Sequence, residues 1–262
     1  DSDQWVVYSI LGSLARLKCA DGLPVFFRYL DHPLLSKPAI TGIGLLGGLE
    51  DGIRLMEQMP ALSRGAVKAM FLAAGSIYRR IAVEEGPDRT GGLVECVSNR
   101  AEDDLKAFFA AQLSVSENIE AGRELLAVLG MIGGRSSLEA VLRFVEHEDL
   151  QVDVDLALYT IARRDPPLLN PMFGHHDHLV RRKAVQTVER TGDRRFLPDL
   201  LTMVGDESGH VRKDAIHALS VLGEEDTIAH LISSLEDEYR DVAQSAAEAL
   251  IRLGVRYPAS VG

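Results

Sequence analysis

Three segments near the C-terminus decide the fold: VRRKAVQTVERTG at residues 180–192, VRKDAIHALSVLG at 211–223 and VAQSAAEALIRLG at 242–254. Each begins 31 residues after the one before it, and valine, alanine, an apolar residue and glycine recur in the same four columns. A fixed period of about 20–50 residues is typical of stacked supersecondary units. The sequence therefore predicts a repeat protein in which each unit packs against its neighbours.

One repeat, His178–Asp206, reads as a pair of helices joined by a tight turn. Val180, Ala184 and Val188 lie four residues apart and therefore share one helix face. Gly192 then permits the left-handed backbone that often ends a helix. A second, shorter apolar stripe follows at Leu197, Leu200, Leu201 and Val204. Because each hairpin has two apolar faces to bury, the hairpins must stack.

The pattern extends over the whole chain. We expect an all-α protein, an α-α superhelix, built as one solenoid over residues 1–262. It should contain about eight helical hairpins plus a terminal helix at Arg240–Leu253. The most regular repeats lie at 176–254. The chain begins at Asp1 without a methionine, inside a repeat-like pattern, so we expect it to be a piece of a longer protein.

The repeats are irregular between residues 61 and 100. Ala66–Ile81 predicts one long helix, whereas Glu84–Gly92 is rich in turn-forming residues and predicts a loop. A solenoid that breaks its period changes its local geometry, so this stretch is a candidate for features particular to this protein.

Composition narrows the class of protein. The chain has 262 residues, 46% of them hydrophobic, and a formal net charge of −11. This acidic balance argues against nucleic acid and anionic membranes as partners. The two cysteines, Cys19 and Cys96, are too far apart in sequence for a metal or redox motif, and we expect reduced thiols in a cytoplasmic protein.

The repeats carry a recognisable motif: an acidic turn, Val-Arg, a spaced alanine, Ala-Leu, and Leu-Gly followed by an acidic residue. In the repeat that begins at Asp206, the motif consists of Asp206, Val211, Arg212, Ala215, Ala218, Leu219, Leu222, Gly223 and Glu224. This pattern resembles HEAT-like repeats of the bacterial type named after phycobilisome (PBS) lyases. The resemblance is strong over Leu179–Leu253 and fair over Trp5–Met59 and Ala121–Leu168. It implies an α-solenoid, and such repeats serve lyase subunits, signalling adaptors and scaffolds alike.

Two histidine-containing motifs could bind a metal. His175, His176 and His178 surround Asp177 and offer nitrogen and oxygen ligands to zinc or another divalent ion. The alternative is a turn between hairpins, because position 175 corresponds to Asp206 one repeat later. The pair His147-Glu148 resembles the iron-binding pairs of the HEAT-repeat enzyme deoxyhypusine hydroxylase, but the further pairs that a di-iron centre needs are missing, so a surface turn is preferred.

Basic residues are concentrated between Arg163 and Lys213, a stretch that contains ten Lys or Arg and seven Asp or Glu. They could form a band that binds an acidic partner or phosphate. Alternatively, Arg181 and Arg212 could bridge to neighbouring acidic turns as an internal ladder, with the other basic residues on a solvated helix face. The ladder is the preferred interpretation.

The sequence favours a non-enzymatic scaffold or adaptor that binds a protein partner. Bacterial signalling is one process in which such an adaptor could act. In such arrays the second helices line a concave surface on which a protein partner binds. The polar or flexible residues that interrupt their apolar stripes, and that we expect to be exposed there, are Arg28, Asp199, Met203, His230 and Ser233. We predict no catalytic residue and no cofactor; the alternative is a bilin-lyase-like or metal-dependent enzyme on the same scaffold. The oligomeric state and the partner's identity stay open.

Overall fold

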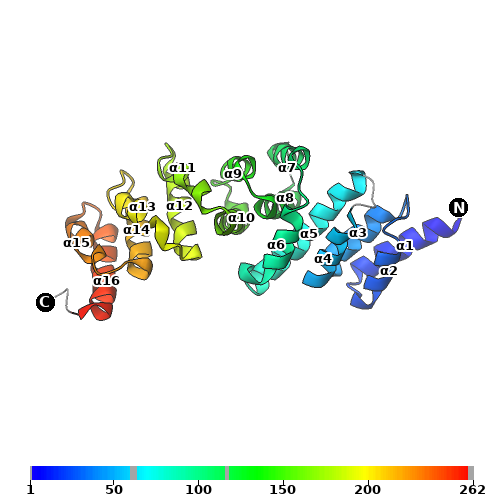
Figure 1. The fold of residues 1–262 in the computed structure, drawn as a ribbon, viewed down its shortest axis with the longest axis horizontal. Helices are drawn as coiled ribbons and strands as arrows, with labels where there is room; N and C mark the ends of the chain where they lie inside the picture. The colour runs from blue at the N-terminus through cyan, green and yellow to red at the C-terminus, as the bar shows by residue number, and fades with distance from the viewer. Residues whose placement is uncertain (1, 60–63, 116–117, 259–262) are drawn as a thin grey trace. The chain divides into compact units, whose positions relative to one another are not determined.

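The computed structural model describes residues 2–59, 64–115 and 118–258. Every regular element in these ranges is an α-helix or a short 3-10 helix, which confirms the all-α prediction. The helices group into two compact units, Asp1–Ile161 and Ala162–Gly262, whose helices are drawn in Figure 1. The prediction of a single solenoid over residues 1–262 stays a prediction.

Unit 1 contains pairs of helices whose longer members pack in series. Its helices are α1 (Ser2–Arg16), α2 (Leu23–Arg28), α3 (Ser36–Leu46), α4 (Leu49–Glu57), α5 (Arg64–Glu84), α6 (Gly91–Ser98), α7 (Asp103–Val115), α8 (Ile119–Ile132), α9 (Arg135–Leu142) and most of α10 (Gln151–Arg164). Helices α1, α3, α5 and α8 contact one another in that order, and the remaining helices pack beside them. The stacking predicted from the apolar stripes is therefore present in this unit.

Close approach between helices in unit 1 depends on small residues. A Cβ atom added to Gly44 of α3 would lie 2.8 Å from the Cα atom of Ala73 in α5. Gly130 of α8 makes the same kind of approach to Ala157 of α10. Because backbone atoms fill the space that a side chain would need, glycine at these positions sets the distance between neighbouring helices.

The irregular stretch differs in part from the prediction. The long helix is confirmed, and α5 extends it to Arg64–Glu84. The expected loop at Glu84–Gly92 is wrong, because most of it is helical: the 3-10 helix η3 (Pro87–Thr90) leads directly into α6. Pro87 fits the first turn of a helix, where no amide donor is needed. The hydroxyl of Thr90, a fully buried residue, donates to the Pro87 carbonyl at 2.6 Å and closes this turn.

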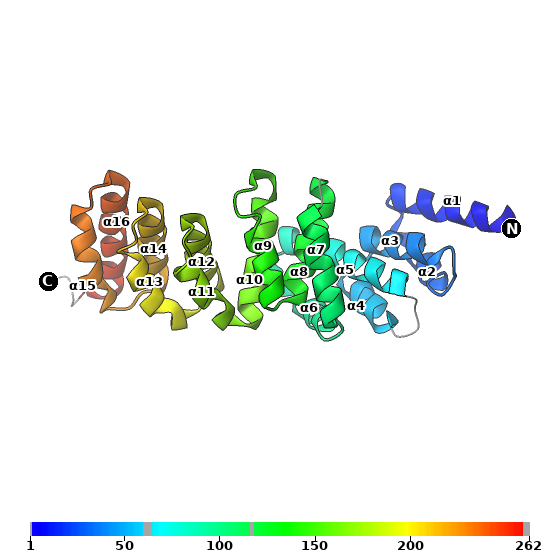
Figure 2. The same cartoon turned by 90° about the horizontal axis from the view of Figure 1, so that it is seen from above.

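Unit 2 is the regular part of the chain. Its helices are α11 (Asn170–Phe173), α12 (His178–Thr191), α13 (Leu197–Met203), α14 (Gly209–Leu222), α15 (Thr227–Ile232) and α16 (Arg240–Arg256), with 3-10 helices η5 (Pro166–Leu169), η6 (Arg194–Phe196) and η7 (Ser233–Glu236). The long helices α12, α14 and α16 pack side by side, and the short helices α11, α13 and α15 each pack on the long helix that follows (Figure 2). We call α12, α14 and α16 the first helices and α11, α13 and α15 the second helices.

The repeated columns form the core of unit 2. The three column valines, at 180, 211 and 242, are each at most 2% exposed, and the column alanines at 184, 215 and 246 are fully buried. Gly192 adopts the expected left-handed conformation, with φ of 70°, at the end of α12. The apolar periodicity read from the sequence is thus the packing pattern of the fold.

Candidate functional site

The turns of unit 2 are tied together by two buried arginines. Arg181 donates from Nε and Nη2 to the two carboxylate oxygens of Asp206, at 2.7 and 2.9 Å, and from Nη1 to the His175 carbonyl at 2.8 Å. One repeat later, Arg212 makes the same bonds to Asp237, at 2.7 and 2.8 Å, and to the Asp206 carbonyl at 2.8 Å. Each arginine therefore joins two consecutive turns, which confirms the predicted ladder.

The ladder fixes the charge state of its members. The hydrogen bond from Arg212 holds the pKa of Asp237 below its usual value, and the bond to Asp237 raises the pKa of the arginine. At Asp206, burial raises the pKa, but hydrogen bonds from Arg181 and Ser208 outweigh it and the net pKa is lowered. A carboxylate that is ionised and already bonded on both oxygens is a poor general base.

The other basic side chains of this region are also paired. Arg182 contacts Asp214 at 2.7 Å and Arg194 contacts Glu224 at 3.1 Å, each across neighbouring repeats. A local pair joins Arg195 to Asp193 at 2.7 Å. These pairs compensate part of the positive charge concentrated in this region.

The histidine motif is a structural turn. The Nδ1 atom of His175 accepts a hydrogen bond from the Asp177 amide at 3.1 Å, as Oδ1 of Asp206 does from the Ser208 amide at 2.8 Å one repeat later. His178 is the first residue of α12 and is exposed, next to the capping Asp177. The described residues contain no group of three or more His, Cys, Asp or Glu arranged to hold a metal ion.

The predicted partner-binding residues fall in different places. Arg28 is exposed at the end of α2 in unit 1, whereas His230 in α15 and Ser233 in η7 are exposed in unit 2. Asp199 in α13 is half-buried. The expected exposure of Met203 is wrong: it is only 7% exposed, because it lies three residues after Leu200 on the inward face of α13.

The structure brings His230 and Ser233 together in a groove. This groove, which we call the ladder groove, has a volume of about 610 Å³ and is lined by Leu201, Val204, Gly205, Asp206, Arg212, His230, Ser233, Ser234, Asp237 and Glu238. Its floor contains the buried Arg212–Asp237 pair, and its rim contains the exposed side chains of α15 and η7. Two of the five predicted residues thus share one site.

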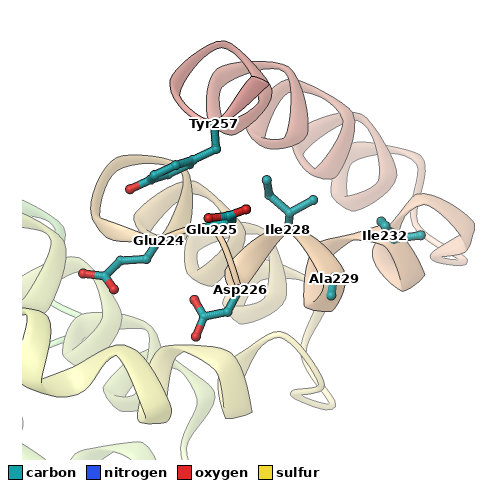
Figure 3. A pocket seen from close by; sticks show the side chains of 7 residues that line it. All are labelled: Glu224, Glu225, Asp226, Ile228, Ala229, Ile232 and Tyr257. Atoms are coloured by element: carbon teal, nitrogen blue, oxygen red, sulfur yellow. The ribbon is translucent and has the colours of Figure 1, made fainter. Parts of the chain in front are cut away.

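A second pocket lies beside α15. We call it the acidic pocket; its volume is about 670 Å³, and it is lined by Glu224, Glu225, Asp226, Ile228, Ala229, Ile232 and Tyr257. Figure 3 shows the acidic residues at the turn before α15 and the aromatic ring of Tyr257 beside them. The run Glu224-Glu225-Asp226 was visible in the sequence, but Tyr257 joins it through folding alone.

Residues 166–251 match the family model described as HEAT repeats. The match begins at η5 and ends within α16, so it covers the repeats of unit 2. The resemblance to HEAT-like repeats is confirmed for this part of the chain. Comparison with proteins of curated function gives no match.

Among solved structures, the chain is similar to a designed armadillo repeat protein, with 15% identity over 88% of this chain and 99% of that chain and a TM-score of 0.35. It is similar to the complex of CpcE and CpcF of phycocyanin lyase from Nostoc sp. PCC7120, with 16% identity, 97% and 91% coverage and a TM-score of 0.35. An engineered protein gives 13% identity, 94% and 81% coverage and a TM-score of 0.34.

None of the helices in the described ranges has an apolar stretch of the length that crossing a membrane requires.

Proposed function

We propose that this chain is a non-enzymatic scaffold that binds a protein partner through the second helices of unit 2. The observation that carries the proposal is the ladder groove. Exposed side chains of α15 and η7 form its rim, and the buried Arg212–Asp237 pair forms its floor. Bidentate arginine–carboxylate pairs hold the turns in one geometry. A surface held rigidly before binding loses less entropy when a partner docks.

The chemistry of the groove fits recognition better than catalysis. Asp206 and Asp237 are engaged by arginines on both carboxylate oxygens, and their pKa values are lowered. They are therefore occupied as structural acceptors. The exposed His230 and Ser233 can donate and accept hydrogen bonds at the rim, which suits contact with another protein.

The test is a pull-down from the source cell, followed by mass spectrometry, with wild-type protein and a His230→Glu variant. We expect the variant to lose a specific partner while its melting temperature stays unchanged. The matched control is His210→Glu, an exposed histidine of α14 outside the groove, which should retain the partner. Equal capture by all three proteins would contradict the proposal.

Two further measurements complete the test. An Arg28→Glu variant asks separately whether unit 1 contributes to partner binding. The competing enzyme hypothesis predicts stoichiometric metal or a visible tetrapyrrole in the purified protein, which metal analysis and an absorption spectrum detect.

A further inference from the structure

The acidic pocket combines carboxylates with exposed apolar and aromatic surface. Ile232 is 55% exposed on α15, next to the exposed Ala229. Tyr257 lines the same pocket from the end of α16. In Figure 3 its ring lies near Glu224 and Glu225, and all three acidic residues surround the start of α15. A ligand that fills this pocket must match negative charge on one side and hydrocarbon on the other.

The negative charge of the pocket is only partly compensated. Glu224 contacts Arg194 at 3.1 Å, and more than half of each side chain is exposed. Among the described residues, Asp226 has no ion-pair partner. From residue 214 to residue 239 the sequence has seven Asp or Glu and no Lys or Arg. Asp214, Glu224, Asp237 and Glu238 of this stretch are paired with arginines outside it, whereas these pairs leave Asp226 of the pocket available to a ligand.

The fold itself does not require acidic residues here. Glu225 and Asp226 occupy the repeat positions held by Arg194 and Arg195 in the previous hairpin, so the charge is reversed from one repeat to the next. Arg194 and Arg195 are exposed, with side chains 56% and 71% accessible. Because exposed side chains of either sign occupy these two turn positions, burial does not explain the choice of carboxylates in the last hairpin.

We propose that the acidic pocket binds an arginine side chain, with an adjacent apolar residue, presented by a basic segment of a protein partner. Arginine matches all of the lining: its planar guanidinium pairs with carboxylates and stacks on an aromatic ring, and its three-carbon stem packs against Ala229 and Ile232. A volume of about 670 Å³ accommodates this side chain together with its apolar neighbour.

This inference rests on the proposed scaffold function and adds the chemistry of the partner. The surface charge disfavours anionic occupants such as phospholipid or nucleic acid. Glu224, Glu225 and Asp226 follow one another on a turn and are not arranged as a metal site in the described structure. A protein segment that carries arginine is the occupant that charge and shape favour together.

The test uses fluorescence anisotropy with the full chain and a labelled Gly-Ser peptide that contains several Arg-Leu pairs. We expect Asp226→Asn to weaken binding about tenfold, since one charged hydrogen bond contributes roughly a factor of ten or more. Tyr257→Ala should weaken it by about threefold through loss of the stacked ring. The matched control is Glu236→Gln, which removes an exposed carboxylate of η7 outside the pocket and should change binding by less than about twofold.

Peptide variants separate specific from general attraction. Replacing arginine by lysine should weaken binding about threefold, because lysine neither stacks nor forms a bidentate pair. Replacing arginine by glutamate should abolish it. Equal loss in the pocket variant and the Glu236→Gln control would overturn the proposal by showing unspecific attraction to the acidic chain. A dimer in sizing experiments that Tyr257→Ala dissociates would overturn it by identifying a second copy as the occupant.

The two proposals can fail separately. If capture of the cellular partner depends on His230 but the affinity for the Arg-Leu peptide is unchanged by the pocket substitutions, the arginine assignment is wrong and the scaffold function stands. If the pocket binds the peptide as expected but no partner depends on His230, the ladder groove is not the docking surface, and the acidic pocket alone carries the interaction.

Discussion

Replacement of Arg212 by methionine measures what the arginine ladder contributes to stability. The side chains of Arg212 and Asp237 are each only 10% exposed, and they share two hydrogen bonds of 2.7 and 2.8 Å. Methionine fills much of the volume but leaves the Asp237 carboxylate buried without its cation. Removing one member of a buried pair typically costs about 3–5 kcal/mol. The lost bond to the Asp206 carbonyl adds about 1 kcal/mol.

We therefore expect the free energy of unfolding to fall by about 4–6 kcal/mol. The residual exposure of the pair favours the lower end of this range. Urea unfolding followed by helical circular dichroism gives this value. The control is Arg194→Met, which breaks the exposed Arg194–Glu224 pair and should cost less than about 1 kcal/mol. If the two variants lose the same small amount, the ladder is no more than a surface ion pair and the reasoning fails.

Three further predictions concern the ladder carboxylate, a close helix contact in unit 1 and the His175 turn. The pKa of Asp237 is lowered in the fold, so its stabilisation is present at neutral pH and is lost as pH falls below about 4; the destabilisation of Arg212→Met, measured by urea unfolding, should shrink over that range. Gly44→Ala should destabilise by about 1–3 kcal/mol, because the new Cβ would meet the Ala73 backbone, whereas Gly12→Ala in open space should not destabilise. His175→Asp should keep the turn, and a thermal melt well below that of the wild type would contradict this.

Periodicity predicted the core well because burial follows directly from it. The column valines and alanines had to face inward once the helical spacing was recognised, and they do. The predicted exposure of Met203 is wrong because a stripe drawn through the aliphatic residues of α13 leaves methionine outside it. Its spacing from Leu200 was the signal that placed it inside.

The candidate site was harder to predict, since it depends on contacts between repeats. His230 and Ser233 are predicted because they interrupt an apolar stripe. The acidic pocket also needs Tyr257, which is more than thirty residues from Glu224 and follows the end of α16. Nothing in the local pattern around Tyr257 marks it as a pocket residue. A sequence read repeat by repeat reveals what repeats share, and pocket walls arise where side chains of different repeats meet.

The ladder shows how one repeat constrains the next. Gln151 stands at the start of α10 in the place that Arg181 has in α12, and its amide donates to the Val145 and His147 carbonyls of its own turn. Arg181, by contrast, also donates to Asp206 in the turn that follows its own hairpin. The turn that follows the Gln151 hairpin has His175 at the position of that carboxylate. Arginine and aspartate are therefore present together or absent together, as expected if neither is stable in the buried ladder alone.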